Sequence, residues 1–354
     1  MGDSDLLTGL LRDVSRSFYL TLRILPQSVR CPIGLAYLLA RATDTIADTR
    51  LVPVDRRLKA LEQLRRYIGS NRSTAPPDLN SFYSRPAGPP EVVGESPSRA
   101  SSAGEASPAE LVLLGRIGEV VAGVRALSAE DQSMIRMVLD TITSGQVLDL
   151  KRFADVMPGQ VRALETNLEL DDYLYRVAGC VGEFWTRICR AHLFPQAGLD
   201  ESSLLENGVR FGKGLQLTNI LRDLPRDLQQ GRCYLPKSEL KAVGLTPQAL
   251  LDPASEPQFR PVFDKHCRVA LDHLRAGWKY TNQIPRRCAR ARLACAWPIL
   301  IGKRTIELLR QERALSAIKP VKVPRKAVRA ILLRSVLAYP WPQLWRRQWP
   351  EKES

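Results

Sequence analysis

The sequence predicts an all-α protein, and two observations lead to that fold class. Apolar residues recur every three or four positions over long stretches, which is the period of a helix with one buried face. Runs that alternate between apolar and polar residues, as half-buried strands do, are absent. Helices are therefore expected over 33–48, 111–125, 134–150, 161–193, 204–224, 262–281, 293–310 and 326–338.

Size and composition are those of a soluble globular protein. The 354 residues are 44% hydrophobic and 25% charged, and they suffice for a large buried core. The longest strongly apolar run, 293–302, is far shorter than the roughly 20 residues that span a bilayer, so no transmembrane helix is expected. The opening MGDSDLLTGL lacks the basic start and apolar run of a secretory signal peptide. Seven scattered cysteines without a C-x-x-C pair indicate reduced thiols, so we expect a cytoplasmic protein.

One segment, 74–109, stands apart from the helical pattern. It holds seven Pro, three Gly and seven Ser among 36 residues, a composition that cannot offset its ordering entropy by burial. Helical spacing resumes directly after it, at ELVLLGRIGEV. We therefore predict a disordered insertion between two helices of a single domain that covers 1–354, and no domain boundary.

Basic residues are concentrated toward the C-terminal end. The net charge is +15, and residues 301–350 contain twelve Lys and Arg but two Asp and Glu. Such a region suits nucleic acid, anionic lipid or an anionic small substrate. No nucleic-acid-binding motif accompanies it and aromatic residues amount to 6%, so a nucleic-acid partner is not expected.

Two aspartates, Asp44 and Asp48, stand four positions apart in the apolar stretch ATDTIADT. On a helix they share one face with Tyr37 and Arg41, because the successive spacings are 4, 3 and 4. Like charges at this spacing repel each other. Either water screens them on an exposed face, as in most isolated D-x-x-x-D matches, or a cation lies between them.

A second stretch, LQLTNILRDLPRDLQQGRCYLP, carries a similar face made of Gln216, Asn219, Asp223 and Asp227. Across a helical bundle, the two faces would form a pocket of unpaired carboxylates, which requires divalent cations. Oxygen ligands without nearby His or Cys favour Mg²⁺, and Mg²⁺ in turn recruits phosphate groups.

The surroundings of these faces add one supporting feature and one conflict. Arg41, Arg222 and Arg232 are basic neighbours that suit the same phosphate anion. Pro225 lies inside the second face, where it lacks an N–H and clashes with the carbonyl four residues earlier. We therefore expect a kink or a fresh helical start there, which would redirect Asp227 relative to Asp223.

Two shorter motifs leave alternatives open. SRSFY, 15–19, places hydroxyl and guanidinium groups before an aromatic residue, and it fits either the edge of a helix or a binding site. In YLYRVAGCVG, 173–182, the small residues Ala178, Gly179 and Gly182 admit close approach of either a neighbouring helix or a ligand. Tight helix packing explains the second motif at least as well as a ligand does.

Taken together, these motifs resemble the squalene/phytoene synthase family of head-to-head trans-prenyltransferases, most closely a bacterial-type squalene synthase. SRSF, the Y-x-x-x-R-x-x-D-x-x-x-D block at 37–48, GQVLDL at 145–150, YLYRVAGCVG and the long N-x-x-x-D-x-x-x-D block followed by GRCYLP occur in the family's order. The likeness extends over about 12–305, except for 74–109.

The resemblance implies a single isoprenoid-synthase-type helical bundle around a central cavity. The implied ligands of Mg²⁺ ions that bridge two prenyl diphosphates are Asp44, Asp48, Asn219, Asp223 and Asp227. The implied contacts to diphosphate oxygens are Ser15, Arg16, Ser17, Tyr37, Arg41, Gln216, Arg222 and Arg232. Phe18 and Tyr173 would stabilise an allylic cation by their ring faces, and Tyr173 would assist proton transfer.

The motif forms favour one product and keep a second open. LARATDTIAD looks like the R-A-x-D-T-x-x-D form of squalene synthases, whereas phytoene synthases more often show a doubled acid. GRCYLP is closer to the phytoene synthase and bacterial pattern. We therefore expect two farnesyl diphosphates to give presqualene diphosphate, with NADPH-dependent reduction to squalene. Condensation of two geranylgeranyl diphosphates to phytoene is the alternative. Non-catalytic assembly factors related to the family would be expected to lose the acidic motifs, and both are complete here.

The C-terminal tail, about 313–354, departs from the animal and fungal squalene synthase pattern because it has no membrane anchor. It ends in LAYPWPQLWRRQWP, with three tryptophans and two arginines. This basic tail either packs on the bundle or rests on an anionic membrane as a peripheral contact.

Overall fold

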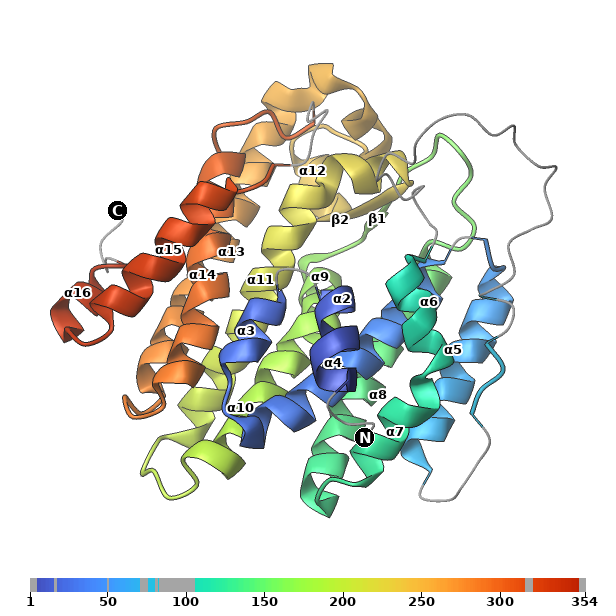
Figure 1. The fold of residues 1–354 in the computed structure, drawn as a ribbon. Helices are drawn as coiled ribbons and strands as arrows, with labels where there is room; N and C mark the ends of the chain where they lie inside the picture. The colour runs from blue at the N-terminus through green and yellow to red at the C-terminus, as the bar shows by residue number, and fades with distance from the viewer. Residues whose placement is uncertain are drawn as a thin grey trace, which may run out of the picture. The chain divides into compact units, whose positions relative to one another are not determined.

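The computed structural model describes residues 5–15, 18–49, 51–70, 76–79, 82, 106–315 and 321–349, except for the side chain of Phe18. Nearly all of these residues are helical, which confirms the all-α prediction (Figure 1). The chain divides into two compact units, residues 1–19 with 31–151 and residues 20–30 with 152–354. None of the described helices combines the length and apolarity needed to cross a membrane.

The first unit is built from helices on both sides of the predicted insertion. They are η1 (Leu6–Leu10), α2 (Leu11–Ser15), most of α4 (Gln27–Asp48), α5 (Val54–Gly69), α6 (Pro108–Gly115), α7 (Ile117–Arg125) and α8 (Ala129–Arg152). Helix α5 lies outside the predicted ranges, although its buried Leu61, Leu64 and Ile68 follow helical spacing. Its many charged residues conceal that stripe.

The predicted insertion ends earlier than expected. Ser107 caps α6 through a reciprocal capping box with Glu110, so 108 and 109 belong to the helix. Leu79 and Phe82, also within 74–109, are buried. The residues 74, 75, 80, 81 and 83–105 lie outside the described part of the chain.

The second unit contains the longest helices of the described chain. Its elements are most of α3 (Phe18–Ile24), and β1 (Arg162–Leu164), α9 (Asn167–Leu174), η3 (Tyr175–Gly179), α10 (Cys180–Leu193), α11 (Glu201–Gln229), β2 (Arg232–Pro236), α12 (Lys237–Ala242), η4 (Pro247–Leu251), η5 (Pro253–Ser255), α13 (Glu256–Gln283), α14 (Ala289–Leu309), α15 (Arg325–Ala338) and α16 (Pro342–Arg346). Helix α11 packs against α10, α13 and α14.

A two-stranded parallel ribbon departs from the prediction that no strand is present. Strands β1 and β2 pair with Arg162 opposite Arg232 and Ala163 opposite Cys233. β1 occupies the start of the predicted helix 161–193, which begins only at Asn167. Three residues are too few to show strand alternation in the sequence.

Of the two expectations for Pro225, the fresh helical start is wrong, because α11 runs unbroken from Glu201 to Gln229, and the kink stays a prediction. Proline inside a helix costs about 3 kcal/mol. Burial of Leu221, Leu224 and Leu228 on both sides of it offsets that cost, since each buried leucine contributes about 1.5–3 kcal/mol. Asp223 and Asp227 therefore lie on one continuous helix.

Candidate active site: two carboxylate-bearing helix faces

The first carboxylate face lies on α4, in the first unit. Leu38, Leu39 and Ile46 are fully buried and fix the rotation of the helix. This rotation leaves Asp44 half-buried and Asp48 exposed. The polar residues thus form a stripe beside an apolar face, as their spacing predicts.

The carboxylate of Asp44 is held by a residue distant in sequence. Gln146 on α8 donates from Nε2 to Asp44 Oδ1 at 2.5 Å. Burial, and next the charge of Asp48, raise the pKa of Asp44 from 3.8 to about 7, although Arg41 and Gln146 act in the opposite direction. A carboxylate in this state gains from a bound cation, because a cation relieves the repulsion from Asp48.

Arg41, on the same face, forms an ion pair with Glu110 of α6. The Glu110 carboxylate also accepts from the backbone N–H of Ser107 at 2.8 Å. Burial alone would raise the pKa of Glu110, but these hydrogen bonds and Arg41 lower it below its ordinary value. Glu110 therefore stays charged and positions the Arg41 guanidinium, whose Nε is buried without a hydrogen-bond partner among the described residues.

Other predicted residues of this unit have simpler environments or lie outside the description. Tyr37 is half-buried on α4. Ser15 is buried, and its hydroxyl donates to the carbonyl of Leu11. Arg16, Ser17 and the side chain of Phe18 lie outside the described residues.

The second carboxylate face lies on α11, and arginines already neutralise it. Arg222 contacts both oxygens of Asp223, with Nε to Oδ1 at 3.0 Å and Nη2 to Oδ2 at 2.7 Å. Arg226 lies 3.7 Å from Asp223 and 3.7 Å from Asp227. The hydrogen bonds to Asp223 raise the pKa of Arg222. The prediction of unpaired carboxylates is thus wrong for this face, because Arg222 and Arg226 pair with its two aspartates. Asn219 and Gln216 are half-buried and lie one and two turns before Asp223, respectively.

The donor atoms on the two faces fit Mg²⁺. In the part of the chain that the structure describes, no group of three or more His, Cys, Asp or Glu side chains gathers where it would hold an ion. Each face offers a pair of carboxylates, and α11 adds the amide of Asn219. Oxygen-only donors in small number are typical of Mg²⁺, which keeps water and phosphate oxygens as its other ligands. The raised pKa of Asp44 is the observation that most favours a cation there.

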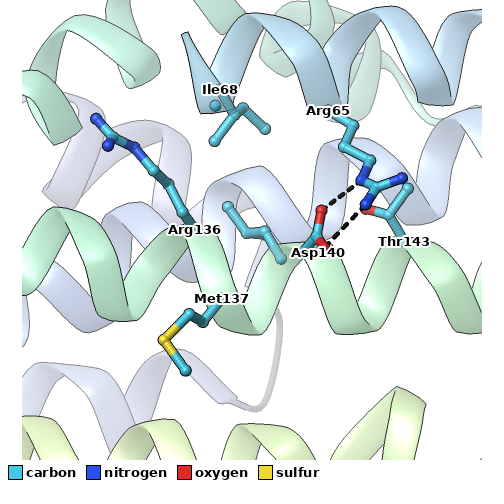
Figure 2. A pocket seen from close by; sticks show the side chains of 8 residues that line it. Arg65, Ile68, Arg136, Met137, Asp140 and Thr143 are labelled. Atoms are coloured by element: carbon cyan, nitrogen blue, oxygen red, sulfur yellow. Dashed lines mark hydrogen bonds and ion pairs between the residues drawn. The ribbon is translucent and has the colours of Figure 1, made fainter. Parts of the chain in front are cut away.

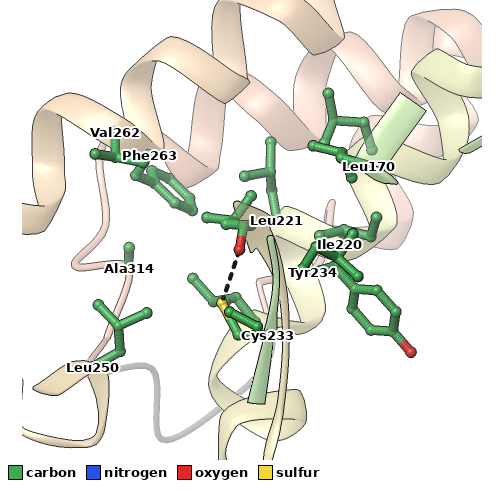
Figure 3. Close-up of a cluster of buried hydrophobic side chains, with 14 of the residues drawn as sticks. Leu170, Ile220, Leu221, Cys233, Tyr234, Leu250, Val262, Phe263 and Ala314 are labelled. Carbon is green, nitrogen blue, oxygen red and sulfur yellow. Dashed lines mark hydrogen bonds between the residues drawn. The ribbon is translucent and has the colours of Figure 1, made fainter. Parts of the chain in front are cut away.

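Tyr173 lies in a stack of aromatic rings in the second unit. Its ring is 4.7 Å from that of Tyr234 at an interplanar angle of 23°, and Phe153 packs edge-on against Tyr234 at 5.6 Å. The guanidinium of Arg232 lies 5.6 Å from the Phe153 ring. These rings belong to a buried apolar cluster, and the Tyr234 hydroxyl points away from Val262 and Phe263 (Figure 3). Aromatic faces next to apolar walls are suited to a carbocation and exclude water.

The motif that starts at Tyr173 serves helix packing. A Cβ at Gly182 would lie 1.9 Å from the backbone oxygen of Gly208, and one at Gly212 would lie 2.1 Å from that of Ala178. Helices α10 and α11 therefore touch backbone to backbone, which confirms the packing alternative. The π-helical turn η3 lies between α9 and α10 at this contact.

Two surface hollows are lined by none of the predicted site residues. In the first unit, Arg65 of α5 binds Asp140 of α8 across a hollow that Arg136 and Met137 also line (Figure 2). In the second unit, Arg152, Arg162 and Lys237 line the other.

Four neighbours of the predicted residues were absent from the sequence prediction, namely Glu110, Gln146, Phe153 and Tyr234. Three of them have a local signal. Glu110 completes the capping pattern S-x-x-E, Gln146 lies in GQVLDL, and Tyr234 lies in GRCYLP. Phe153 has none, because its role depends on a ring 81 positions away.

Comparisons with known proteins identify the family of this chain. The family model described as squalene/phytoene synthase matches residues 11–327. The presqualene diphosphate synthase of Rhodopseudomonas palustris is 30% identical over 321 residues, which cover 90% of this chain and 92% of that protein. The 15-cis-phytoene synthase of a Synechocystis species is 33% identical over 147 residues, 39% of this chain and 43% of that protein.

A solved structure of TcSQS with the ligand E5700 has the same fold. Its TM-score is 0.75 at 22% identity, and the alignment covers 98% of this chain and 90% of the other. The predicted fold type, a helical bundle of the isoprenoid synthase kind, is thereby confirmed. With the match over 11–327, the conclusion is that this chain belongs to the squalene/phytoene synthase family of prenyltransferase-type enzymes, which act on prenyl diphosphates.

Proposed function

We propose that the protein condenses two farnesyl diphosphates head to head to presqualene diphosphate. The observation that carries this proposal is the similarity to a presqualene diphosphate synthase along 90% of the chain. The similarity to the phytoene synthase covers 39% of the chain. The complete carboxylate pairs on α4 and α11 support a catalytic role over that of a non-catalytic relative.

The two carboxylate faces have the donor set for the metal that such a reaction uses. Bound Mg²⁺ would neutralise the charge that develops on a departing diphosphate. The proposed ligands are Asp44, Asp48, Asn219, Asp223 and Asp227. Gln146 would hold Asp44 in place by its hydrogen bond, and Arg222 would do the same for Asp223.

A set of basic, hydroxyl and amide side chains would bind diphosphate oxygens. A guanidinium has five N–H donors, so the ion pairs of Arg41 and Arg222 leave donors for a substrate. The proposed set is Ser15, Arg16, Ser17, Tyr37, Arg41, Gln216, Arg222 and Arg232.

Carbon–carbon bond formation would take place against aromatic and apolar walls. Loss of diphosphate from one chain leaves an allylic cation, and the double bond of the second chain adds to it. A proton is then lost as the cyclopropane closes, and Tyr173 would assist its transfer. The stacked faces of Tyr173 and Tyr234, with Phe18, would stabilise the cation until that step.

Two finer expectations remain predictions. Reduction of presqualene diphosphate to squalene with NADPH rests on the form of the first acidic motif. Synthesis of phytoene from two geranylgeranyl diphosphates is the alternative, and the partial similarity to a phytoene synthase supports it. A cytoplasmic location is likewise an expectation from the sequence.

One assay tests these proposals together. Purified protein is incubated with Mg²⁺ and either C15 or C20 diphosphate, with and without NADPH, and the extracted lipids are identified by mass spectrometry. We expect presqualene diphosphate from the C15 substrate. Phytoene from the C20 substrate alone would replace the proposal by its alternative, and squalene formed only with NADPH would establish the reduction.

The Tyr173→Phe variant tests the role of the hydroxyl separately from that of the ring. The ring stack with Tyr234 remains, so the variant should keep the wild-type circular dichroism spectrum. Loss of an acid–base group should lower kcat by about 100-fold or more. Wild-type turnover in this variant would show that the ring face alone matters.

A further inference from the structure

The two C-terminal helices, α15 and α16, have one face docked on the second unit. Trp345 stacks on Trp278 with ring centres 5.2 Å apart, and its Nε1 donates to Asn282 Oδ1 at 2.8 Å. Trp297 Nε1 donates to Ser335 Oγ at 2.9 Å, and Ser335 is fully buried. The orientation of α15 and α16 on α13 and α14 is therefore fixed (Figure 1).

The opposite face of these helices exposes a dense set of apolar side chains. The exposed large apolar residues are Leu333 at 60%, Val336 at 47%, Leu337 at 59%, Trp341 at 58% and Leu344 at 47%. The other large apolar residues that are exposed in the described chain are scattered over positions 20–251. Isolated exposed apolar residues need no explanation, but five within twelve positions indicate an interaction surface.

Cations border this apolar surface, and acids are absent from it. Residues 321–349 contain seven Lys and Arg and no Asp or Glu. Lys326 and Arg329 are exposed and lie at helical spacing from Leu333 and Leu337, so they continue the same face. Arg334, Arg346 and Arg347 are also exposed.

We propose that this face, Lys326 to Leu344, binds the surface of an anionic lipid membrane with α15 lying in the plane of the interface. Leucine and tryptophan side chains enter the boundary between headgroups and acyl chains, while the cations contact anionic headgroups. A second copy of the chain is disfavoured as the occupant, because a two-fold contact would place the two cationic faces against each other. The buried tryptophans hold the face outward, so binding needs no rearrangement of the helices.

Vesicle co-sedimentation of the full chain tests the proposal without relying on activity. Wild-type protein should pellet with phosphatidylcholine–phosphatidylglycerol vesicles, less with phosphatidylcholine alone, and less as salt is raised. The Lys326→Glu/Arg329→Glu variant should bind anionic vesicles about tenfold more weakly or worse. The Leu333→Ser/Leu337→Ser/Trp341→Ser variant should lose binding at both low and high salt.

Matched controls separate this face from general charge and general apolarity. Lys59→Glu/Lys241→Glu changes the net charge equally at exposed sites elsewhere, and Met137→Ser/Met157→Ser/Leu168→Ser removes exposed apolar groups elsewhere. Both controls should bind as wild type does, and all variants should keep wild-type circular dichroism and turnover of detergent-dispersed substrate.

Three results would overturn the proposal. The first is absence of binding to anionic vesicles, and the second is equal loss of binding in the controls. The third is a wild-type dimer in light scattering that the Leu333→Ser/Leu337→Ser/Trp341→Ser variant dissolves. Brominated lipids give a direct reading, because they should quench wild-type fluorescence more than that of Trp341→Phe.

Discussion

The carboxylate faces of α4 and α11 share the D-x-x-x-D spacing but differ in how their charge is balanced. On α4, Asp44 is held by the neutral Gln146 and has a pKa raised to about 7. On α11, Asp223 is bound through both oxygens by Arg222, and Arg226 lies near both aspartates. The Asp44 carboxylate on α4 is thus hydrogen-bonded to a neutral amide, whereas the Asp223 carboxylate on α11 is paired with an arginine.

This difference shows that the same D-x-x-x-D spacing can occur with two different charge environments. On α4, Asp44 and Asp48 repel each other, and a bound cation would relieve that repulsion. The charge of Asp44 should therefore depend on both pH and metal concentration. The α11 face is already neutralised, so a metal there must compete with guanidinium groups. Sensitivity to Mg²⁺ and pH should therefore originate mainly on α4.

Removal of one carboxylate from each face should have the largest effect. We expect Asp44→Ala and Asp223→Ala each to lower kcat/KM for presqualene diphosphate formation by about 100-fold or more. Asp140→Ala, which removes an acid paired with Arg65 on the first unit, should leave turnover unchanged. Full activity in both site variants would refute the proposed metal role of the faces.

The raised pKa of Asp44 predicts a pH dependence of stability. Because the folded value of about 7 exceeds the ordinary 3.8, the folded state binds this proton more tightly. The stabilisation is complete below the ordinary value and disappears as the pH rises through about 7. Urea unfolding in metal-free buffer should therefore show wild type losing about 4 kcal/mol relative to Asp44→Asn between pH 4 and 8. A constant difference across that range would contradict the burial of this carboxylate.

Residues that hold the carboxylates should separate the two faces more finely. Gln146→Leu should raise the Mg²⁺ concentration for half-maximal activity about tenfold, because Asp44 loses its only neutral donor in the described contacts. Arg222→Lys should instead raise KM about tenfold, because one contact to Asp223 and donors to diphosphate are lost. Gln132→Leu is a matched change on α8, where the side chain binds the backbone carbonyls of Arg125 and Leu127 and the guanidinium of Arg136. None of these groups belongs to the proposed site, so this variant should alter neither quantity. If Gln146→Leu raised only KM and Arg222→Lys raised the Mg²⁺ requirement, metal sensitivity would belong to α11 and not to α4.

The smallest expected effect concerns the support of Arg41. Glu110→Gln keeps an acceptor for the α6 cap but removes the charge that pairs with Arg41, and should lower the free energy of unfolding by about 1 kcal/mol. Ser107→Ala removes the cap instead and should cost a similar amount, about 1 kcal/mol. Glu119→Gln, which changes an exposed ion-pair residue on α7, should cost less than either variant in the same denaturant titration. A cost for Glu110→Gln no larger than that control would show the pair to be unimportant.

The helices were the most predictable part of the chain, because each depends on local periodicity. The range 134–150 lies within α8, 262–281 within α13 and 326–338 within α15. The glycine-rich motif also allowed the correct alternative of close helix packing, since a Cβ at position 182 would overlap the backbone of Gly208. Spacing alone also predicted that Asp44 and Asp48 share one helix and that Asp223 and Asp227 share another.

The surroundings of those faces were not predictable, because they come from distant residues. Arg41 pairs with Glu110, which lies 69 positions away in the sequence, and Asp44 accepts a hydrogen bond from Gln146, which lies 102 positions away. The fresh start expected at Pro225 failed for a related reason, since leucine burial in the folded chain overrides a local preference. The Arg222–Asp223 pair is adjacent in sequence, but its two-fold contact depends on rotamers that sequence does not fix.

The backbone contact between Gly182 and Gly208 limits how this chain can vary over evolutionary time. Even a single methyl group at position 182 would overlap a backbone oxygen, and one at 208 would lie 2.5 Å from the Thr186 hydroxyl oxygen. Replacement of either glycine by alanine would require α10 and α11 to move apart, and a later change at the other glycine would not remove that overlap. Substitutions in this part of the chain are therefore expected at outward-facing residues rather than at the two glycines.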